Sequence, residues 1–336
     1  MQQNHVTMKD IANRLGVSSV TVSKALGDKE GVSDELKQKI KEIAQEMGYR
    51  FNTAAKAMKE GLSYNIGVVI AERYASVTQS FYLQFYQYLS TALEDVQYSG
   101  ILHMLSEEDE GQLVLPRIYH DRKVDGFIIL GQLSNAYISA IHETGIPLVF
   151  LDFYTDRTEL DYVITDNFYG MYEMTNYLIA NGHRDIAFVG SLHATSSIQD
   201  RFLGYYKSLL EHRIPLRQEY ILNDRDENGK LLDVAIPEVL PTAFACNCDQ
   251  VAYLLMNTLR KQGVRVPEDC SVVGFDNDIY ATLAEPALTT VEVDRQEMAK
   301  TAVNKMVRKI SDPALSSGRV LVRGKMIYRE SVRSMK

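Results

Sequence analysis

Hydrophobic positions in the first fifty residues recur at helical spacing, three, four or seven residues apart. The predicted helices cover residues 8–15, 19–26 and 34–47. Gly16 separates the first helix from the second, and Gly48 is expected to close the third in the left-handed conformation. Ser18 and Ser33 precede the second and third helices as N-caps. The pattern predicts a small all-α head.

After Ser63 the pattern changes to short apolar strands that alternate with amphipathic helices. The predicted strands are Ile66–Ile70, Ile101–Leu105, Gly126–Leu130, Leu148–Leu151, Tyr162–Thr165, Ile186–Val189, Ala243–Cys246 and Ser271–Phe275. The predicted helices are Phe81–Val96, Gly170–Asn181, Phe202–His212, Asp249–Gln262 and Gln296–Ile310. Such alternation is typical of right-handed crossovers in parallel sheets. Because the stretch is too long for one hydrophobic core, we expect two doubly wound α/β lobes.

The changes of pattern also give the expected domain boundaries. The head is expected to cover 1–50, a hinge and linker 51–63, and an α/β domain 64–336. Within that domain, the first lobe is expected to contain about 64–165 and 294–320, and the second about 166–291 and 321–336. Each lobe is therefore built from segments that are distant in the sequence.

Composition and charge narrow the class of protein. The apolar runs fall far short of the ~20 residues of a membrane span. The polar start, Met1–His5, has no secretory pattern, so we expect a cytoplasmic protein without a membrane partner. The net charge is −8, but residues 1–60 carry ten Lys/Arg against eight Asp/Glu, a balance of +2. The overall acidity therefore does not exclude DNA binding by the head.

No catalytic or metal-binding pattern stands out. Phosphate-binding glycine motifs, the nucleophile elbow and the HExxH zinc motif are missing from the sequence. The histidines are scattered without metal-ligand spacing, and the three cysteines, Cys246, Cys248 and Cys270, are expected to be reduced and mostly buried. We therefore expect no metal, no cofactor and no enzymatic activity.

The spacing of small residues in the first two helices fits a helix-turn-helix. Counting from Met8, Ala12 is fifth, Gly16 ninth and Val22 fifteenth. A small residue lets the two helices approach, a glycine forms the turn, and a buried aliphatic anchors the second helix. By itself this pattern leaves open a helical bundle that binds nothing.

The head closely resembles the lactose/galactose-repressor (LacI/GalR) family. The match is most specific at Asp10-Ile11-Ala12, Gly16-Val17-Ser18 and Thr21-Val22-Ser23, and it continues through Val32-Ser33, Gly48-Tyr49 and Asn52. The resemblance places the second helix in the major groove of DNA. Base-edge contacts then fall on Ser19, Val20 and Lys24. Phosphate contacts fall on Thr7, Ser18, Thr21 and Ser23.

Residues 51–59 are similar to the family's hinge helix, which the resemblance implies folds on DNA and wedges a side chain into the minor groove. The DNA contacts of this hinge fall on Asn52, Ala55, Lys56 and Met58. Met58 stands where the family usually has leucine, and Phe51 where it often has proline. These departures leave the ordering of the hinge and the degree of DNA bending open.

The remainder resembles the family's periplasmic-binding-protein-like effector domain. Matching segments are Ile66-Gly67-Val68-Val69, Val124-Asp125-Gly126, Ile146-Pro147-Leu148-Val149, Gly182-His183-Arg184, Val272-Val273-Gly274-Phe275-Asp276 and Pro286-Ala287-Leu288-Thr289-Thr290. Ligands of two-lobed folds bind between the lobes, outside the carboxyl ends of strands.

The family's effector contacts fall on Asp152, Arg201 and Asp276, with Ser197 and Asp249 as additions. At the start of a predicted helix, Phe81 or Tyr82 either stacks on a sugar ring or packs in the core. Cys248 replaces an asparagine that is common in the family, which leaves the identity of the ligand open.

These observations predict a sequence-specific DNA-binding repressor of carbohydrate-use genes. It would bind double-stranded operator DNA as a homodimer, and a small effector, a sugar, would switch its affinity. One alternative is a regulator of the same fold that responds to a nucleobase or a phosphoprotein. The other is a sugar-binding protein that does not bind DNA.

Overall fold

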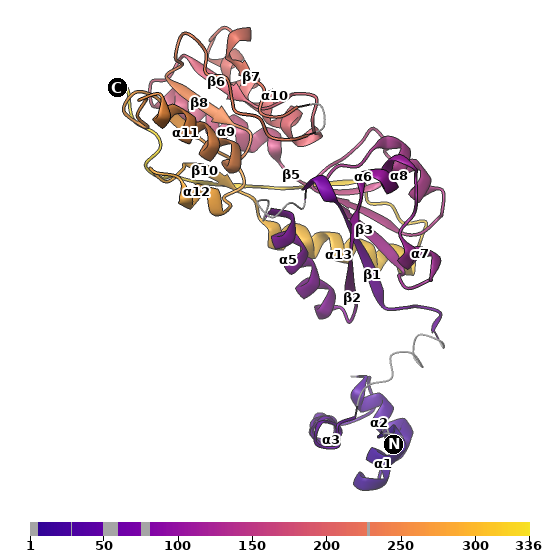
Figure 1. The fold of residues 1–336 in the computed structure, drawn as a ribbon. Coiled ribbons are helices and arrows are strands. Elements are labelled where there is room, and N and C mark those ends of the chain that lie inside the picture. Colours follow the sequence, from indigo (N-terminus) through magenta and orange to yellow (C-terminus); the bar gives the residue numbers. More distant parts are fainter. Residues whose placement is uncertain (1–5, 28, 50–59, 75–80, 227–228) are drawn as a thin grey trace. The chain divides into compact units, whose positions relative to one another are not determined.

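The computed structural model describes residues 6–27, 29–49, 60–74, 81–226 and 229–336. The chain divides into two compact units, Met1–Leu62 and Ser63–Lys336. The described part of the smaller unit contains helices and no strand, whereas the larger unit combines helices with parallel sheets (Figure 1). Among the described residues, no helix is both long enough and apolar enough to cross a bilayer.

The smaller unit is built by α1 (Met8–Leu15), α2 (Ser19–Leu26) and α3 (Asp34–Glu46). Its core contains Ile11, Ala12, Val22, Ala25, Ile40 and Ala44. Gly16 ends α1 with a φ of +66°, and Gly48 follows α3 with a φ of +67°. Both glycines thus take the left-handed conformation that the sequence predicts, and the fold of the head is a helix-turn-helix with a third supporting helix.

The first lobe of the larger unit is a six-stranded parallel sheet in the order β11-β5-β4-β3-β1-β2. Its strands are β1 (Asn65–Ala71), β2 (Ser99–Leu105), β3 (Gly126–Leu130), β4 (Leu148–Leu151), β5 (Asp161–Thr165) and β11 (Arg319–Val322). Its helices are η1 (Glu72–Tyr74), α5 (Phe81–Asp95), α6 (Glu107–Gly111), α7 (Arg117–His120), α8 (Asn135–His142) and α13 (Arg295–Ser311). The sheet is covered on both faces, as expected of parallel strands.

Alternate residues of β1 show how the two faces are filled. Val68 and Ile70 pack with α5 and α13, whereas Val69 packs with α8. Helix α13 comes from the far end of the chain and lies beside α5 (Figure 1). Each lobe is therefore completed by a segment that is remote in sequence.

The second lobe is a four-stranded parallel sheet in the order β7-β6-β8-β9, accompanied by the antiparallel pair β10-β12. Its strands are β6 (Ile186–Val189), β7 (Ile221–Leu222), β8 (Ala243–Cys246), β9 (Ser271–Val273), β10 (Thr290–Glu292) and β12 (Lys325–Ile327). Its helices are α9 (Asn167–Ala180), α10 (Ser196–Glu211), η2 (Gln218–Tyr220), α11 (Asp249–Lys261) and α12 (Ile279–Leu283). The chain passes between the lobes after β5, between β10 and α13, and between β11 and β12.

Three features differ from the pattern in the sequence. Helix α10 begins at Ser196, six residues before the predicted start, because Thr195 caps it and its first turns are polar. The short strands β7, β10, β11 and β12 were not predicted, since two to four residues at a sheet edge show no clear period. Strand β11 continues to Val322, past the lobe boundary expected at residue 320.

Candidate DNA-binding surface and effector pocket

The exposed face of α2 carries the residues predicted to read DNA bases. Val22 and Ala25 are buried in the head, while Ser19, Val20, Ser23 and Lys24 are exposed. Val20 is 66% exposed, so its side chain is free to contact a partner. The helix therefore presents a short polar and apolar surface with one cation and no acidic residue.

The start of α2 is held by its own hydroxyls. The backbone N–H of Thr21 donates to Ser18 Oγ at 3.0 Å, and the hydroxyls of Ser18 and Thr21 lie 2.8 Å apart. Such a cap fixes the first turn and leaves the remaining N–H groups at the helix N-terminus for an anion. The same geometry that stabilises α2 thus suits phosphate binding.

Thr7 occupies the equivalent place at the start of α1. Its backbone N–H donates to Asp10 Oδ2 at 2.8 Å, and Asp10 N–H donates back to the Thr7 hydroxyl at 3.4 Å. The Thr7 hydroxyl also donates to Asp10 Oδ2, at 2.7 Å, and this hydrogen bond, together with the one from the Thr7 backbone N–H, lowers the pKa of Asp10. Thr7 is exposed at this helix end.

The predicted hinge contacts lie outside the described residues. They are Asn52, Ala55, Lys56 and Met58.

A cavity of about 110 Å³ lies between the two lobes of the larger unit. Six of the seven residues predicted to bind an effector line it: Phe81, Tyr82, Asp152, Ser197, Arg201 and Asp276. Phe81 and Tyr82 come from the start of α5, Asp152 follows β4, and Asp276 follows β9. The cavity, called the inner cavity below, thus collects residues from carboxyl ends of strands and from helix N-termini.

Arg201 is the central cation of the inner cavity and is only 5% exposed. Its Nε donates to Asn167 Oδ1 at 2.8 Å, Nη1 donates to the carbonyl of Asn247, and Nη2 donates to Asp276 Oδ1 at 3.2 Å. The guanidinium also stacks on the Phe275 ring, 3.8 Å from its centroid. These contacts fix the plane of the guanidinium before any ligand arrives.

Asp152 is buried with one oxygen unsatisfied. Its Oδ2 accepts a hydrogen bond from the Tyr82 hydroxyl at 2.9 Å, whereas Oδ1 has no hydrogen-bond partner among the described residues. Burial raises the pKa of Asp152 to about 7, opposed by the charge of Arg201. A buried acceptor without a donor costs free energy, on the order of 1–3 kcal/mol, and is therefore a position where a ligand hydroxyl would be stabilising.

The backbone around the inner cavity departs from ordinary conformations at both aspartates. Asp152 has a φ of +72° and Asp276 a φ of +107°. Left-handed conformations of non-glycine residues are strained and concentrate at ligand sites. Burial raises the pKa of Asp276, and burial together with the charge of Asp276 raises that of Asp278 to about 6.

The structure places Asp249 outside the lining of the inner cavity. It is fully buried, accepts from the Thr290 hydroxyl at 2.6 Å and from the N–H of Asp278 at 3.0 Å. Its carboxylate lies directly against Gly274, where a Cβ would clash. Asp249 therefore connects α11 to the loops after β9 and to β10, and its two oxygens are already in use.

Several lining residues were not found by sequence reasoning. Tyr74, Thr195, Arg225, Gln250 and Asp278 also line the inner cavity, beside Cys248, which the sequence had already indicated. Arg225 follows the two-residue strand β7, which has no sequence pattern of its own. Asp278 gave a weak signal as the N-cap of the short helix α12, with its carboxylate accepting from Tyr280 N–H.

The three thiols are free in the structure. Cys246 and Cys270 are buried and Cys248 is half-buried, and burial raises the pKa of each. Within the described residues, no group of three His, Cys, Asp or Glu side chains is arranged to hold a metal ion.

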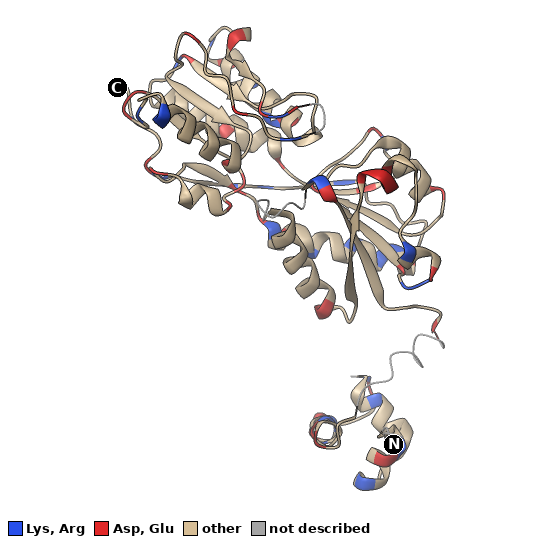
Figure 2. Cartoon of the chain, in the orientation of Figure 1, with Lys and Arg blue, Asp and Glu red and all other residues tan. Residues whose placement is uncertain are grey.

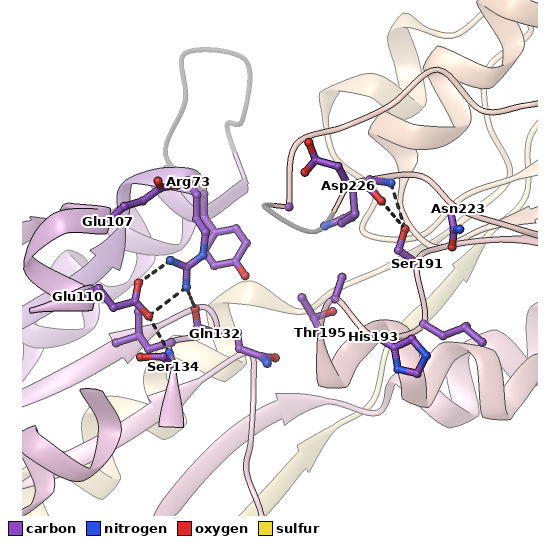
Figure 3. Close-up of a pocket in the computed structure, with 17 residues that line it drawn as sticks. Arg73, Glu107, Glu110, Gln132, Ser134, Ser191, His193, Thr195, Asn223 and Asp226 are labelled. Atoms are coloured by element: carbon purple, nitrogen blue, oxygen red, sulfur yellow. Dashed lines mark hydrogen bonds and ion pairs between the residues drawn. The ribbon is translucent and has the colours of Figure 1, made fainter. Parts of the chain in front are cut away.

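A second, larger cavity of about 830 Å³ adjoins the inner one and shares Tyr74, Thr195 and Arg225 with it. In Figure 3, Arg73, Glu110 and Gln132 line it on one side, and His193, Asn223 and Asp226 on the other. We call it the outer cavity. Its volume is that of an ordinary small-molecule site.

Family comparisons match both units of the chain. Residues 7–52 match the family model of bacterial regulatory proteins, lacI family, and residues 175–332 match a periplasmic binding protein-like domain. The chain is 30% identical to the "Probable HTH-type transcriptional repressor ExuR" of Bacillus subtilis (strain 168), over 98% of this chain and 99% of that protein. It is 27% identical to the ribose operon repressor of Haemophilus influenzae, over 98% and 99%.

Solved structures share the fold over the full chain. A lac repressor dimer bound to operator and the anti-inducer ONPF has a TM-score of 0.71 at 24% identity, and covers 98% of this chain and 100% of that one. A complex of the transcriptional regulator CelR with cellobiose has a TM-score of 0.69 at 24% identity, over 97% and 100%. With the full-length relative at 30% identity and the matched head, the chain belongs to the lacI family of bacterial regulatory proteins, which are DNA-binding transcription regulators.

Proposed function

We propose that this regulator is a homodimeric repressor of carbohydrate-use genes, and that a sugar bound in the inner cavity switches its affinity for operator DNA. A relative named as a ribose operon repressor supports a role in carbohydrate use. The observation that carries the proposal is buried Asp152, whose Oδ1 has no partner within the part of the chain that the structure describes, at a cavity that also holds the Arg201–Asp276 pair.

The chemistry of the inner cavity suits a polyhydroxyl ligand. A sugar hydroxyl would donate to Asp152 Oδ1, and a neighbouring hydroxyl would bind the Arg201 and Asp276 side chains. Ser197 would add a hydroxyl contact, and the rings of Phe81 and Tyr82 would pack on an apolar face of the sugar. Asp249 has no part in this contact set because it does not line the cavity.

In the head, α2 would enter the major groove with Ser19, Val20 and Lys24 at base edges. Lys24 would donate to a guanine, and Val20 would contact a thymine methyl group. Phosphate contacts would come from Thr7, Ser18, Thr21 and Ser23. The hinge residues Asn52, Ala55, Lys56 and Met58 would act in the minor groove.

Switching follows from a ligand that contacts both lobes. Asp152 and Tyr82 belong to the first lobe, whereas Arg201 and Asp276 belong to the second. A sugar that bridges them favours one lobe arrangement, and a homodimer whose hinges pair in only one arrangement then gains or loses operator affinity.

The test is operator binding with and without effector. An operator is selected from random duplexes with the full-length protein, and its affinity is measured by fluorescence anisotropy with a panel of sugars and nucleobases. At least one sugar should change the operator affinity several-fold, and Arg201→Ala should abolish that response. Asp152→Asn serves as a second, milder variant, and Arg117→Ala, which removes an exposed arginine of α7, is the control.

Two results would contradict the proposal. Failure to select any operator would contradict the proposal that this head binds specific DNA. A response of operator affinity to nucleobases alone would contradict the proposed sugar site. The same holds if Arg201→Ala and Asp152→Asn both remain folded and leave the response to a sugar unchanged.

A further inference from the structure

The outer cavity continues the inner one toward solvent. Tyr74, Thr195 and Arg225 line both, so a ligand in the inner cavity that extends past these residues enters the outer cavity. Both lobes contribute to it, as Figure 3 shows for Glu110 and Gln132 on one side and His193 and Asn223 on the other. A ligand long enough to occupy both cavities would thus contact each lobe twice.

Arg225 lies at the junction and is held in place. Its Nε and Nη2 donate to Asp224 Oδ2 at 3.0 and 2.6 Å, and Asp224 is itself buried and bound by Ser191 N–H at 2.7 Å. Among the described residues, none accepts a hydrogen bond from Arg225 Nη1. An oxygen atom that links two rings would find a fixed donor there.

The charges of the outer cavity disfavour an anionic ligand. Its two arginines are already paired, Arg73 with Glu110 and Arg225 with Asp224. Glu107 and Asp226 also line it, and Glu107 belongs to the acidic first turn of α6, coloured red in Figure 2. A phosphate or carboxylate placed here would meet carboxylates without a free cation among the described residues.

We propose that the effector is a neutral saccharide of at least two units, with one ring in the inner cavity and the next in the outer cavity. This inference rests on the proposed function, because it extends the same sugar site. Arg225 contacts the linkage between the rings, and His193 and Asn223 hydrogen-bond the outer ring. The outer ring adds affinity and contributes a second bridge between the lobes.

The test uses calorimetry on the full-length protein. The probes are glucose, galactose, xylose and ribose, the disaccharides cellobiose, lactose and maltose, and a 6-phosphate of the disaccharide that binds best. We expect one disaccharide to bind at least about tenfold more tightly than either of its own monosaccharides, the equivalent of one or two additional hydrogen bonds. Its phosphate ester should bind more weakly than the neutral sugar.

Variants of the outer cavity distinguish the contribution of the outer sugar ring to binding affinity from that of the inner ring. His193→Ala combined with Asn223→Ala removes two exposed side chains that form no hydrogen bond within the described residues, so the fold should be unaffected. We expect the double variant to weaken disaccharide binding about tenfold and to leave monosaccharide binding unchanged. Asn135→Ala, another exposed asparagine, is the matched control and should change neither affinity.

The outcomes distinguish this inference from the proposed function. If monosaccharides bind as tightly as disaccharides, or the double variant leaves disaccharide affinity unchanged, the outer-ring assignment is overturned and the inner sugar site stands. If the phosphate ester binds more tightly than the neutral disaccharide, the charge argument is overturned. If no sugar binds, the proposed function and this inference are both overturned.

Discussion

At the scale of single residues, Asp152 combines three properties that rarely occur together. It is buried, its backbone is in a left-handed conformation, and one of its carboxylate oxygens accepts no hydrogen bond from any described residue. Each of these costs free energy in the absence of a ligand. A ligand hydroxyl bound to that carboxylate oxygen would offset part of this cost, so the protonation and the contacts of Asp152 make the clearest residue-level tests.

The pH dependence of stability should report on Asp152. Burial raises the pKa of this carboxyl from 3.8 to about 7, so between these values the folded state binds more protons than the unfolded state. Its contribution to the free energy of unfolding therefore falls as pH rises through that window. We expect Asp152→Asn to unfold at a higher temperature than the native protein at pH 8, with the difference much smaller at pH 4.

The same substitution should weaken sugar binding, because asparagine cannot serve as an ionised acceptor. Asparagine tolerates a positive φ, so the backbone need not change. A variant that is destabilised at pH 8, as judged by thermal unfolding, would contradict the burial cost assigned to this carboxyl.

Lys24 should determine specificity in the head. Lys24→Ala removes the cation at the exposed face of α2, and we expect a loss of about 1–3 kcal/mol at the selected operator together with relaxed preference at one base pair. Binding-site selection followed by affinity measurement on single-base variants checks this. Lys39→Ala, an exposed lysine of α3, is the control and should leave the base preference unchanged.

At the scale of elements, the head is built from short helices whose ends are capped by hydrogen bonds. Helices α1 and α2 have eight residues each, too few to be stable alone in water. Their caps and the left-handed Gly16 supply local stability, and the buried side chains of α1, α2 and α3 supply the rest. Loss of one cap should therefore be measurable.

Removal of the α2 cap should destabilise the head by about 1 kcal/mol. Ser18→Ala deletes the oxygen that accepts from Thr21 N–H, whereas Ser19→Ala changes a neighbouring exposed serine that does not cap. Hydrogen exchange measured by mass spectrometry on the full-length protein should show faster exchange across α2 for Ser18→Ala only. Equal exchange rates across α2 in the two variants would mean that the Ser18 cap does not contribute measurably to the stability of this helix.

At the scale of the whole larger unit, side chains join the lobes beside the inner cavity. The Tyr154 hydroxyl of the first lobe donates to Asp200 Oδ1 on α10 at 2.8 Å, and Ser196 N–H donates to Gln132 Oε1 at 3.1 Å. From α13, Arg295 reaches the carbonyls of Asp276 and Asn277 at 3.4 and 3.3 Å. These contacts hold the lobes in an arrangement that brings the cavity residues together.

Removing one interlobe bond should therefore lower ligand affinity without touching the ligand. We expect Tyr154→Phe to weaken binding of the effector sugar by about fivefold, roughly the contribution of one hydrogen bond of about 1 kcal/mol. Tyr86→Phe is the matched control, because the Tyr86 hydroxyl donates to the carbonyl of Gly100 within the first lobe. Equal affinities of the two variants, measured by calorimetry, would rule out a role for the Tyr154–Asp200 bond in lobe positioning.

The sequence alone determined the local features of this protein. The helices of the head, their caps at Ser18 and Ser33, and the turn at Gly16 follow from local propensity and spacing, so they could be predicted. The central strands were equally clear, since strands buried on both faces are continuous apolar runs. Motif resemblance also indicated Asp152, Arg201 and Asp276, which lie next to strongly patterned elements.

Tertiary structure decided which of these groups meet and which are already occupied. Asp249 has the position of a ligand contact in sequence. In the structure it packs against Gly274, and its two carboxylate oxygens accept hydrogen bonds from Thr290 and Asp278 within the protein. Tyr74 reaches the cavities from the single-turn helix η1 and Arg225 from the loop after β7, neither of which has a sequence pattern. Strand β11 pairs with β5, and β10 with β12, across intervening segments that belong to other parts of the fold. Local sequence fixes backbone conformation through short-range sterics and capping, whereas a site between lobes depends on long-range contacts that no local pattern encodes.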